Sequence, residues 1–105
     1  MYQIVISKDF SKSVGARNRE DGPFSGQEFY ETLLEPMFLK AKESKDKLTV
    51  NFDGGYGYSP SFIDESFGQL GRKFGEQTVL NTLLFISEDE PTLIDGVRKK
   101  IKGED

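Results

Sequence analysis

Residues 47–71 read KLTVNFDGGYGYSPSFIDESFGQLG, and this stretch passes from a strand through a glycine-rich loop into a helix. In its first part, large apolar residues alternate with polar ones, which is typical of a strand with one face in the core. After the loop, Ser59 precedes Pro60, the pattern of a helix N-cap with proline at the first helical position. Helical spacing then relates Phe62, Ile63, Phe67, Leu70 and Phe74. The stretch therefore predicts a strand–loop–helix unit.

Two further short apolar runs predict strands. Residues 2–7 (YQIVIS) mix β-branched and aromatic residues, and residues 78–87 (TVLNTLLFIS) form a third run. Strands that alternate with helices favour a largely parallel or mixed sheet joined by crossover helices. We therefore expect an α/β fold with a mixed β-sheet and helices packed mainly on one face, in a single domain formed by residues 1–105.

Two further helices are expected on either side of the quoted stretch. The first spans about residues 25–44, where Ser25 and Glu28 match a capping box. Pro36 lies inside it and predicts a kink or a break near Glu35, because proline removes a backbone hydrogen bond and clashes with the preceding turn. The second helix follows the EDEP segment and ends in the basic run RKKIK, where cations complement the helix dipole.

Two glycines, Gly68 and Gly71, fall inside the helix predicted after Pro60. Each costs a helix up to ~1 kcal/mol relative to alanine. A close approach to a neighbouring element would offset this cost, so we expect that such an approach occurs here.

The composition excludes several classes of function. The 105 residues include no cysteine and no histidine, so that disulfides, thiolate chemistry and His-dependent hydrolytic triads are impossible. The formal net charge of -4 argues against nucleic-acid binding, which relies on clustered Lys and Arg. No segment approaches the ~18 apolar residues of a membrane span, and no signal peptide is recognised. We expect a cytoplasmic protein that uses no membrane, metal or cofactor.

The loop and the helix start after it carry most of the candidate binding residues. Glycines and free N–H groups at a helix start would suit an anion, and Arg17 and Arg19 would supply positive charge to bind it. Solvated surface charge is the commoner role of such arginines. The endings and spacings of the known phosphate-binding loops are absent. Tyrosines are favoured at protein interfaces. The candidate partner-binding residues are Asp53, Tyr56, Tyr58, Ser59, Ser61, Asp64 and Glu65.

The acidic residues of this region allow two interpretations each. A catalytic site would rest on Asp53, Asp64 and Glu65, but carboxylates such as Asp64 and Glu65 also suit the first turn of a helix. Asp53 follows a strand, where α/β proteins often place a working residue, and it would equally orient the loop by accepting backbone N–H bonds. The acidic run 88–90 resembles a cation-binding patch, but capping of the last helix is the plainer explanation.

Ser59 and Ser61 are candidate phosphorylation or switch residues. Each matches a helix cap, Ser59 ahead of Pro60 and Ser61 ahead of Asp64. A phosphate at a helix start meets unpaired N–H groups and the positive end of the dipole, while it adds about two negative charges to an accessible surface. Capping alone also explains both serines, so both interpretations stay open.

The quoted stretch, together with GARNREDGPFSGQEFYETLLEPM ahead of it, resembles the STAS-like domain of unknown function found in bacteria and their prophages. The resemblance covers about residues 10–100. Members look like the anti-sigma-factor antagonists, which form a compact α/β domain and bind a serine kinase of the histidine-kinase-like ATPase superfamily. The most specific matches are the region from Arg17 to Gly22 and the motif Ser61-Phe62-x-Asp64-Glu65 with Phe67 and Gly68.

In those antagonists, a serine at the start of the helix after a central strand is phosphorylated, and phosphorylation releases the kinase. Ser59 falls at that position, and Ser61 is the serine of the STAS-like motif. The antagonists have Asp-Ser followed by a small residue and Gly, whereas Tyr58 precedes Ser59 and Pro60 follows it here. The resemblance implies this fold and makes the phosphoserine switch a candidate.

The resemblance implies a non-enzymatic regulatory module that docks a protein partner through residues 53–68, with the phosphoserine as a means of tuning. The alternative is a small-ligand or anion-binding domain that uses the helix N-terminus at 59–65 with Arg17 or Arg19. A homodimer also stays open, because unpaired sheet edges invite pairing.

Overall fold

The sheet of the computed structural model, which describes residues 1–104, is parallel throughout. Its strands β1 (Tyr2–Val5), β2 (Leu48–Asn51) and β3 (Leu83–Ile86) lie in the order β1-β2-β3. Ile4 lies opposite Val50, and Val50 lies opposite Phe85, so that these side chains share the inner face. The predicted α/β fold is confirmed, and the sheet is purely parallel where a mixed one was expected.

The first long helix runs without a break from Gly26 to Glu43. It consists of α2 (Gly26–Phe29), a widened π-helical turn η2 (Tyr30–Leu34) and α3 (Glu35–Glu43). In the widened turn, the Glu35 N–H bonds to the Tyr30 carbonyl, five residues back. The turn ends just before Pro36, where the regular hydrogen-bond pattern would have lost a donor. The predicted interruption near Glu35 is therefore a π turn within a continuous helix.

The second long helix has the same design. It consists of α4 (Pro60–Ile63), a π-helical turn η3 (Asp64–Gly68) and α5 (Gln69–Phe74), and it ends at Gly75, whose φ of 90° starts a new direction. The remaining helices are α1 (Ile6–Asp9), the 3-10 turn η1 (Arg19–Asp21), α6 (Glu76–Thr82) and α7 (Thr92–Lys102).

The predicted strand at residues 78–87 is only half correct. Residues up to Thr82 belong to α6, and β3 begins at Leu83. In α6, the Thr82 hydroxyl donates to the Thr78 carbonyl one turn earlier, and Val79 is buried. A short apolar run does not distinguish a buried strand from a buried helical turn by its periodicity, which is why the sequence pattern failed here.

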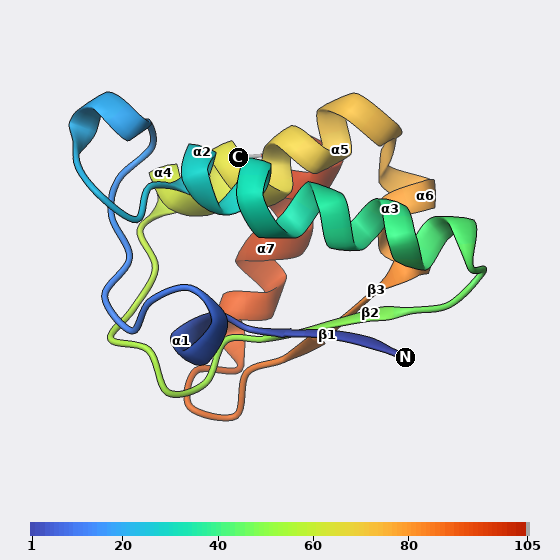
Figure 1. Ribbon diagram of the computed structural model, residues 1–105, viewed down its shortest axis with the longest axis horizontal. Helices are drawn as coiled ribbons and strands as arrows, with labels where there is room; N and C mark the ends of the chain where they lie inside the picture. Colours follow the sequence, from blue (N-terminus) through green and yellow to red (C-terminus); the bar gives the residue numbers. More distant parts are fainter. Residues whose placement is uncertain (105) are drawn as a thin grey trace.

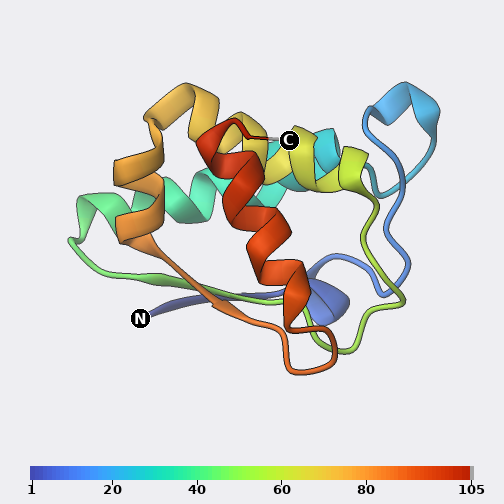
Figure 2. The same cartoon turned by 180° about the vertical axis from the view of Figure 1, so that it is seen from behind.

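The helices α2 to α7 lie on one face of the sheet, as Figures 1 and 2 show from opposite sides. The core between them is rich in phenylalanine: the ring of Phe29 lies 5.6 Å from Phe62 and 6.0 Å from Phe67. Phe67 in turn lies 5.5 Å from Phe52 at the end of β2. The cluster fixes α2, α4 and the strand end relative to one another, so it positions the loop that joins β2 to α4.

The other face of the sheet is more open. Gln3, Thr49 and Leu84 lie in register across it, and Leu84 is 48% exposed. Within residues 1–104, no helix is long and apolar enough to cross a membrane.

Candidate functional site

Asp53 joins the loops that follow β2 and β3, at the carboxyl ends of these parallel strands. One carboxylate oxygen accepts the backbone N–H of Glu88 at 3.0 Å, and the other accepts that of Asp89 at 2.9 Å. A second contact joins the two loops, in which the Asp89 carboxylate accepts the Gly54 N–H at 3.1 Å. Of the two interpretations that the sequence allowed for Asp53, the structure supports the orienting role.

The two tyrosines of this loop have different environments. Tyr58 packs its ring 5.3 Å from Phe52 and 5.9 Å from Phe62, and its hydroxyl donates to the Phe52 carbonyl at 2.8 Å. Burial, aided by the negative charge of Asp53, raises the pKa of Tyr58 to about 12. Tyr56 lies at the loop tip and is 81% exposed. Tyr58 therefore anchors the loop to the core, whereas the side chain of Tyr56 is exposed to solvent.

Ser59 is the N-cap of α4. Its hydroxyl accepts the Phe62 N–H at 3.2 Å, and Pro60 occupies the first helical position, as predicted. Such a cap contributes about 1 kcal/mol to helix stability. Ser61 is the second helical residue and is half-buried, so it is not the cap. Ser59 itself is exposed, and the two serines therefore differ in both role and access.

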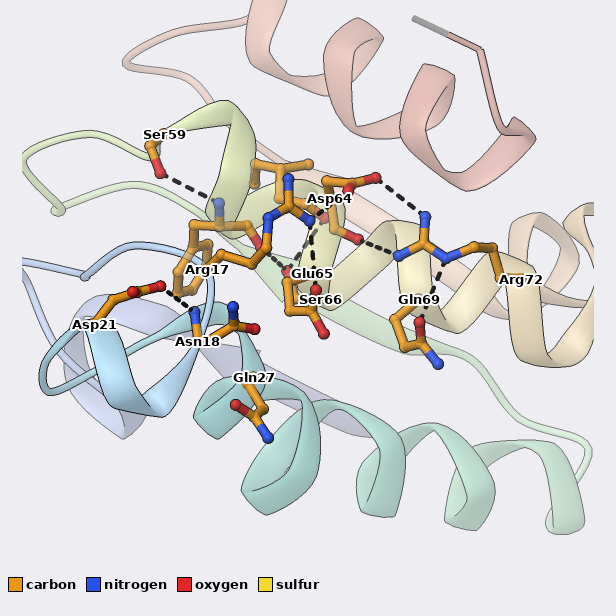
Figure 3. A network of polar contacts seen from close by, with 12 residues as sticks. Arg17, Asn18, Asp21, Gln27, Ser59, Asp64, Glu65, Ser66, Gln69 and Arg72 are labelled. Carbon is orange, nitrogen blue, oxygen red and sulfur yellow. Dashed lines mark hydrogen bonds and ion pairs between the residues drawn. The ribbon is translucent and has the colours of Figure 1, made fainter.

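An ion network joins the long connection before α2 to the helix α4–η3–α5 (Figure 3). Asp64 lies between two guanidinium groups: Arg17 contacts it at 2.6 Å and Arg72 at 3.1 Å. Arg17 also contacts Glu65 at 3.3 Å. Burial acts to raise the pKa of Asp64, but the hydrogen bonds from both arginines outweigh it and the pKa is lowered. The hydrogen bond to Asp64 is the main reason that the pKa of Arg17 is raised.

Arg19 is also paired, with Glu31 of the first long helix at 2.9 Å. Its backbone N–H bonds to Gln27, and next to it Asn18 and Asp21 form a capping box around η1. Both arginines that the anion-binding alternative requires are therefore engaged with carboxylates of the chain itself.

Two adjoining cavities lie beside the loop and share Tyr58 and Leu93. The first, of about 190 Å³, opens between the two loops and is lined by Phe52, Gly55, Tyr56, Gly57, Tyr58, Ser87, Asp89, Glu90 and Leu93. The second, of about 140 Å³, lies between α4 and α7 and is lined by Tyr58, Pro60, Ile63, Leu93, Gly96, Val97 and Lys100. The first has an acidic rim and the second is largely apolar. Together they form a groove along the first turns of α7.

The family described as STAS-like domain of unknown function (DUF4325) matches residues 25–93, which is well over half of the chain. The chain belongs to this family. No curated protein and no solved structure matches it. The family character indicates a regulatory module, and the matched range includes the strand, loop and helix start described above.

In this STAS-like domain, the two most specific parts of the sequence resemblance meet in space. Arg17 belongs to one and Asp64 and Glu65 to the other, and the ion network joins them. No pattern in the sequence predicted Arg72, the second cation of the network. Arg72 follows Asp64 by eight residues, and it reaches back over two turns because η3 inserts one extra residue into the helix.

The acidic residues on which a catalytic site would rest do not share one set of contacts. Asp53 bonds to the loop at Glu88 and Asp89, whereas Asp64 bonds to Arg17 and Arg72. Within residues 1–104, no group of three or more acidic side chains is placed to hold a metal ion. The predicted capping of the last helix by the acidic run 88–90 is wrong, because Pro91 occupies the N-cap and no side chain caps α7.

Proposed function

We propose that this STAS-like domain is a non-enzymatic, cytoplasmic regulatory module that docks a protein partner through residues 53–68. The observation that carries the proposal is the exposed rim formed by Tyr56 and Ser59. Tyr56 is 81% exposed beside a cavity of about 190 Å³, and the Ser59 side chain is exposed at the adjoining helix start. A large amphipathic side chain next to a pocket is a common anchor at protein interfaces.

The loop is held in one conformation before any partner arrives. The Asp53 carboxylate accepts the Asp89 N–H, and the Asp89 carboxylate accepts the Gly54 N–H. The Tyr58 hydroxyl donates to the Phe52 carbonyl. A loop that is already ordered loses little conformational entropy on binding. This favours docking of a folded partner over a role as a flexible linker.

The serines of this surface are suited to regulation in different ways. A phosphate on Ser59 would stay at the N-terminus of α4, where the cap already accepts an N–H group. Ser61 precedes Asp64 and Glu65 by three and four residues, so a phosphate there would face the same side of the helix as those carboxylates. We propose Ser59 as the better tolerated phosphorylation site, with Ser61 as the second candidate.

The partner that we propose is an ATPase-type serine kinase or anti-sigma factor of the histidine-kinase-like superfamily. The support is the resemblance to anti-sigma-factor antagonists, in which such a kinase docks beside the serine. A phosphate at the docking rim would weaken binding through added negative charge and lost shape complementarity.

The test uses the purified chain and a purified histidine-kinase-like ATPase from the same genome, chosen first among any encoded near its gene. Biolayer interferometry should show binding that Ser59→Asp weakens by about tenfold or more. Ser59→Asn is the matched control, since it keeps a cap acceptor of the same shape without the charge. After incubation with Mg·ATP, mass spectrometry should find the phosphate on Ser59.

Docking itself is tested separately from the switch. Tyr56→Ala should weaken binding about tenfold, whereas Leu39→Ala, which truncates another exposed side chain on α3, should leave it unchanged. If neither Ser59→Asp nor Ser61→Asp alters binding, the switch is wrong. If Tyr56→Ala and Leu39→Ala behave alike, the docking surface lies elsewhere.

A further inference from the structure

Helix α7 and the loop before it carry opposite charges at their two ends. The acidic end is formed by Glu88, Asp89, Glu90 and Asp95, and the basic end by Arg98, Lys99, Lys100 and Lys102. None of the ion pairs found within residues 1–104 uses any of these side chains. Asp89 accepts the Gly54 N–H, and Arg98 lies over the ring of Phe85. The other charges are available to a binding partner, and along the groove they run from Asp89 and Glu90 at one end to Lys100 at the other.

The groove beside α7 has an apolar centre between these charges. Leu93, Gly96, Val97 and Lys100 line it with the i, i+3, i+4, i+7 spacing of a single helix face. At Gly96, an added Cβ would meet no atom within 4 Å. Figure 2 shows α7 crossing the near side of the molecule over its whole length. A glycine at an open point of a helix lets the backbone of another helix approach closely.

We propose that the groove is occupied by α7 of a second copy of the chain, in a two-fold symmetric, antiparallel dimer. In an isologous interface the same patch faces itself, so the negative end of each α7 meets the positive end of the other. With the two-fold axis one residue before Gly96, the two positions lie five residues to either side of it, so Lys100 of each copy lies against Glu90 of its partner. A parallel arrangement would place like charges together and is disfavoured.

The charge pattern selects a second copy among the conceivable occupants. The helix is complementary to itself only when reversed, and the exposed centre is small and apolar at Leu93 and Gly96. Because the contact is small, the dimer is weak and forms at micromolar or higher concentrations. Tyr58 and Pro60 line the same groove, so the dimer covers part of the proposed docking surface. The inference does not depend on the docking function.

Sedimentation velocity from about 1 µM to about 500 µM tests the dimer, because a reversible dimer depends on concentration. The wild-type chain should pass from monomer to dimer over this range. Gly96→Leu fills the groove at a site with space for the side chain, and it should raise the dimer dissociation constant about tenfold or more. Gln77→Leu places the same side chain at an exposed position of α6, outside the groove lining, and should leave dimerisation unchanged.

Charge reversal tests the antiparallel orientation. Glu90→Lys and Lys100→Glu should each weaken the dimer several-fold, about threefold to tenfold, because each places like charges opposite one another. The double variant should restore dimerisation, since it exchanges the two signs across the interface. Raising the salt concentration should weaken the wild-type dimer by screening these charges. Circular dichroism of each variant verifies that the monomer is folded.

Three results would overturn the proposal. The first is a wild-type chain that stays monomeric over the whole range. The second is a dimer that persists unchanged in Gly96→Leu. The third is a dimer that Leu84→Lys abolishes while Gly96→Leu does not, because Leu84 lies on the open face of the sheet and the contact would belong there.

Discussion

Helix α7 contacts its neighbours in two different ways along its length. At its basic end it lies directly on α5, where an added Cβ at Gly71 would come within 2.9 Å of the Ile101 carbonyl carbon. Nearer its start it leaves a cavity of about 140 Å³ against α4, and Gly96 faces open space. The two glycines look alike in the sequence, yet one permits a helix contact and the other leaves a surface uncovered.

This difference separates the contacts that stabilise the fold from the surface that remains available for association. At the closed end, backbone meets backbone and the nearby polar groups are paired, as with Asp64 and Arg72. At the open end, apolar side chains line a groove, and the charges around it take part in none of the ion pairs found within residues 1–104. Substitutions at the closed end should therefore act on stability, and those at the open end on association.

The largest effect is expected from Gly71→Ala. The new methyl group would overlap the backbone of Ile101, which cannot turn aside as a side chain can. Overpacking of this kind costs typically 1–3 kcal/mol, and the better helix propensity of alanine returns up to ~1 kcal/mol. We expect a net loss of about 1–2 kcal/mol in the free energy of unfolding, measured by urea denaturation.

Gly68→Ala provides the control for this substitution. Its methyl group would approach the ends of the Asp64 and Arg72 side chains at 2.8 and 3.1 Å, and these can shift. The loss should be clearly smaller than for Gly71→Ala. Equal stability of Gly71→Ala and the wild type would show that α5 and α7 are not in close contact.

A smaller effect is expected from Asp64→Asn, which removes the charge between Arg17 and Arg72. These partly exposed ion pairs and hydrogen bonds should be worth about 1 kcal/mol together. Because the pKa of Asp64 is lowered in the folded state, its contribution is present above its ordinary pKa of about 4 and is lost as the pH falls through the folded value. Urea denaturation at several pH values measures it.

The stability difference between wild type and Asp64→Asn should thus be constant above about pH 5 and shrink below about pH 4. Glu65→Gln is the matched control, since Glu65 has a single, longer contact at 3.3 Å with Arg17. Its loss should be smaller than that of Asp64→Asn above about pH 5. A difference for Asp64→Asn that is as large at pH 3 as at pH 7 would show that the charge of Asp64 is not the cause.

The sequence predicted the parts of the fold that depend on local chemistry. The alternation at Leu48 and Val50 predicted β2, Ser25 and Ser59 cap the predicted helices, and the close approach expected for the internal glycines exists at Gly71. These features follow from backbone geometry and from the burial of single residues, which a short sequence window records.

The parts that the sequence missed depend on contacts between distant elements. Residues 78–82 are helical because α6 packs its buried Val79 into the core, and a short apolar run does not encode that choice. The pairing of Arg17 with Asp64 needs the connection before α2 to reach α4. The groove residues Leu93 and Lys100 gave no signal, since they resemble any amphipathic helix face.

The smallest effect, and the only gain, is expected from Gly96→Ala at the open end. The site is helical and exposed, and a methyl group there would meet nothing within 4 Å. Alanine is favoured over glycine in such a position because the unfolded chain has less freedom to lose, which is worth about 0.5–1 kcal/mol. Urea denaturation at a concentration where the chain is monomeric should show this gain, opposite in sign to Gly71→Ala. A loss at Gly96 would mean that a part of the chain itself already occupies the groove, and it would remove the contrast between the two ends of α7.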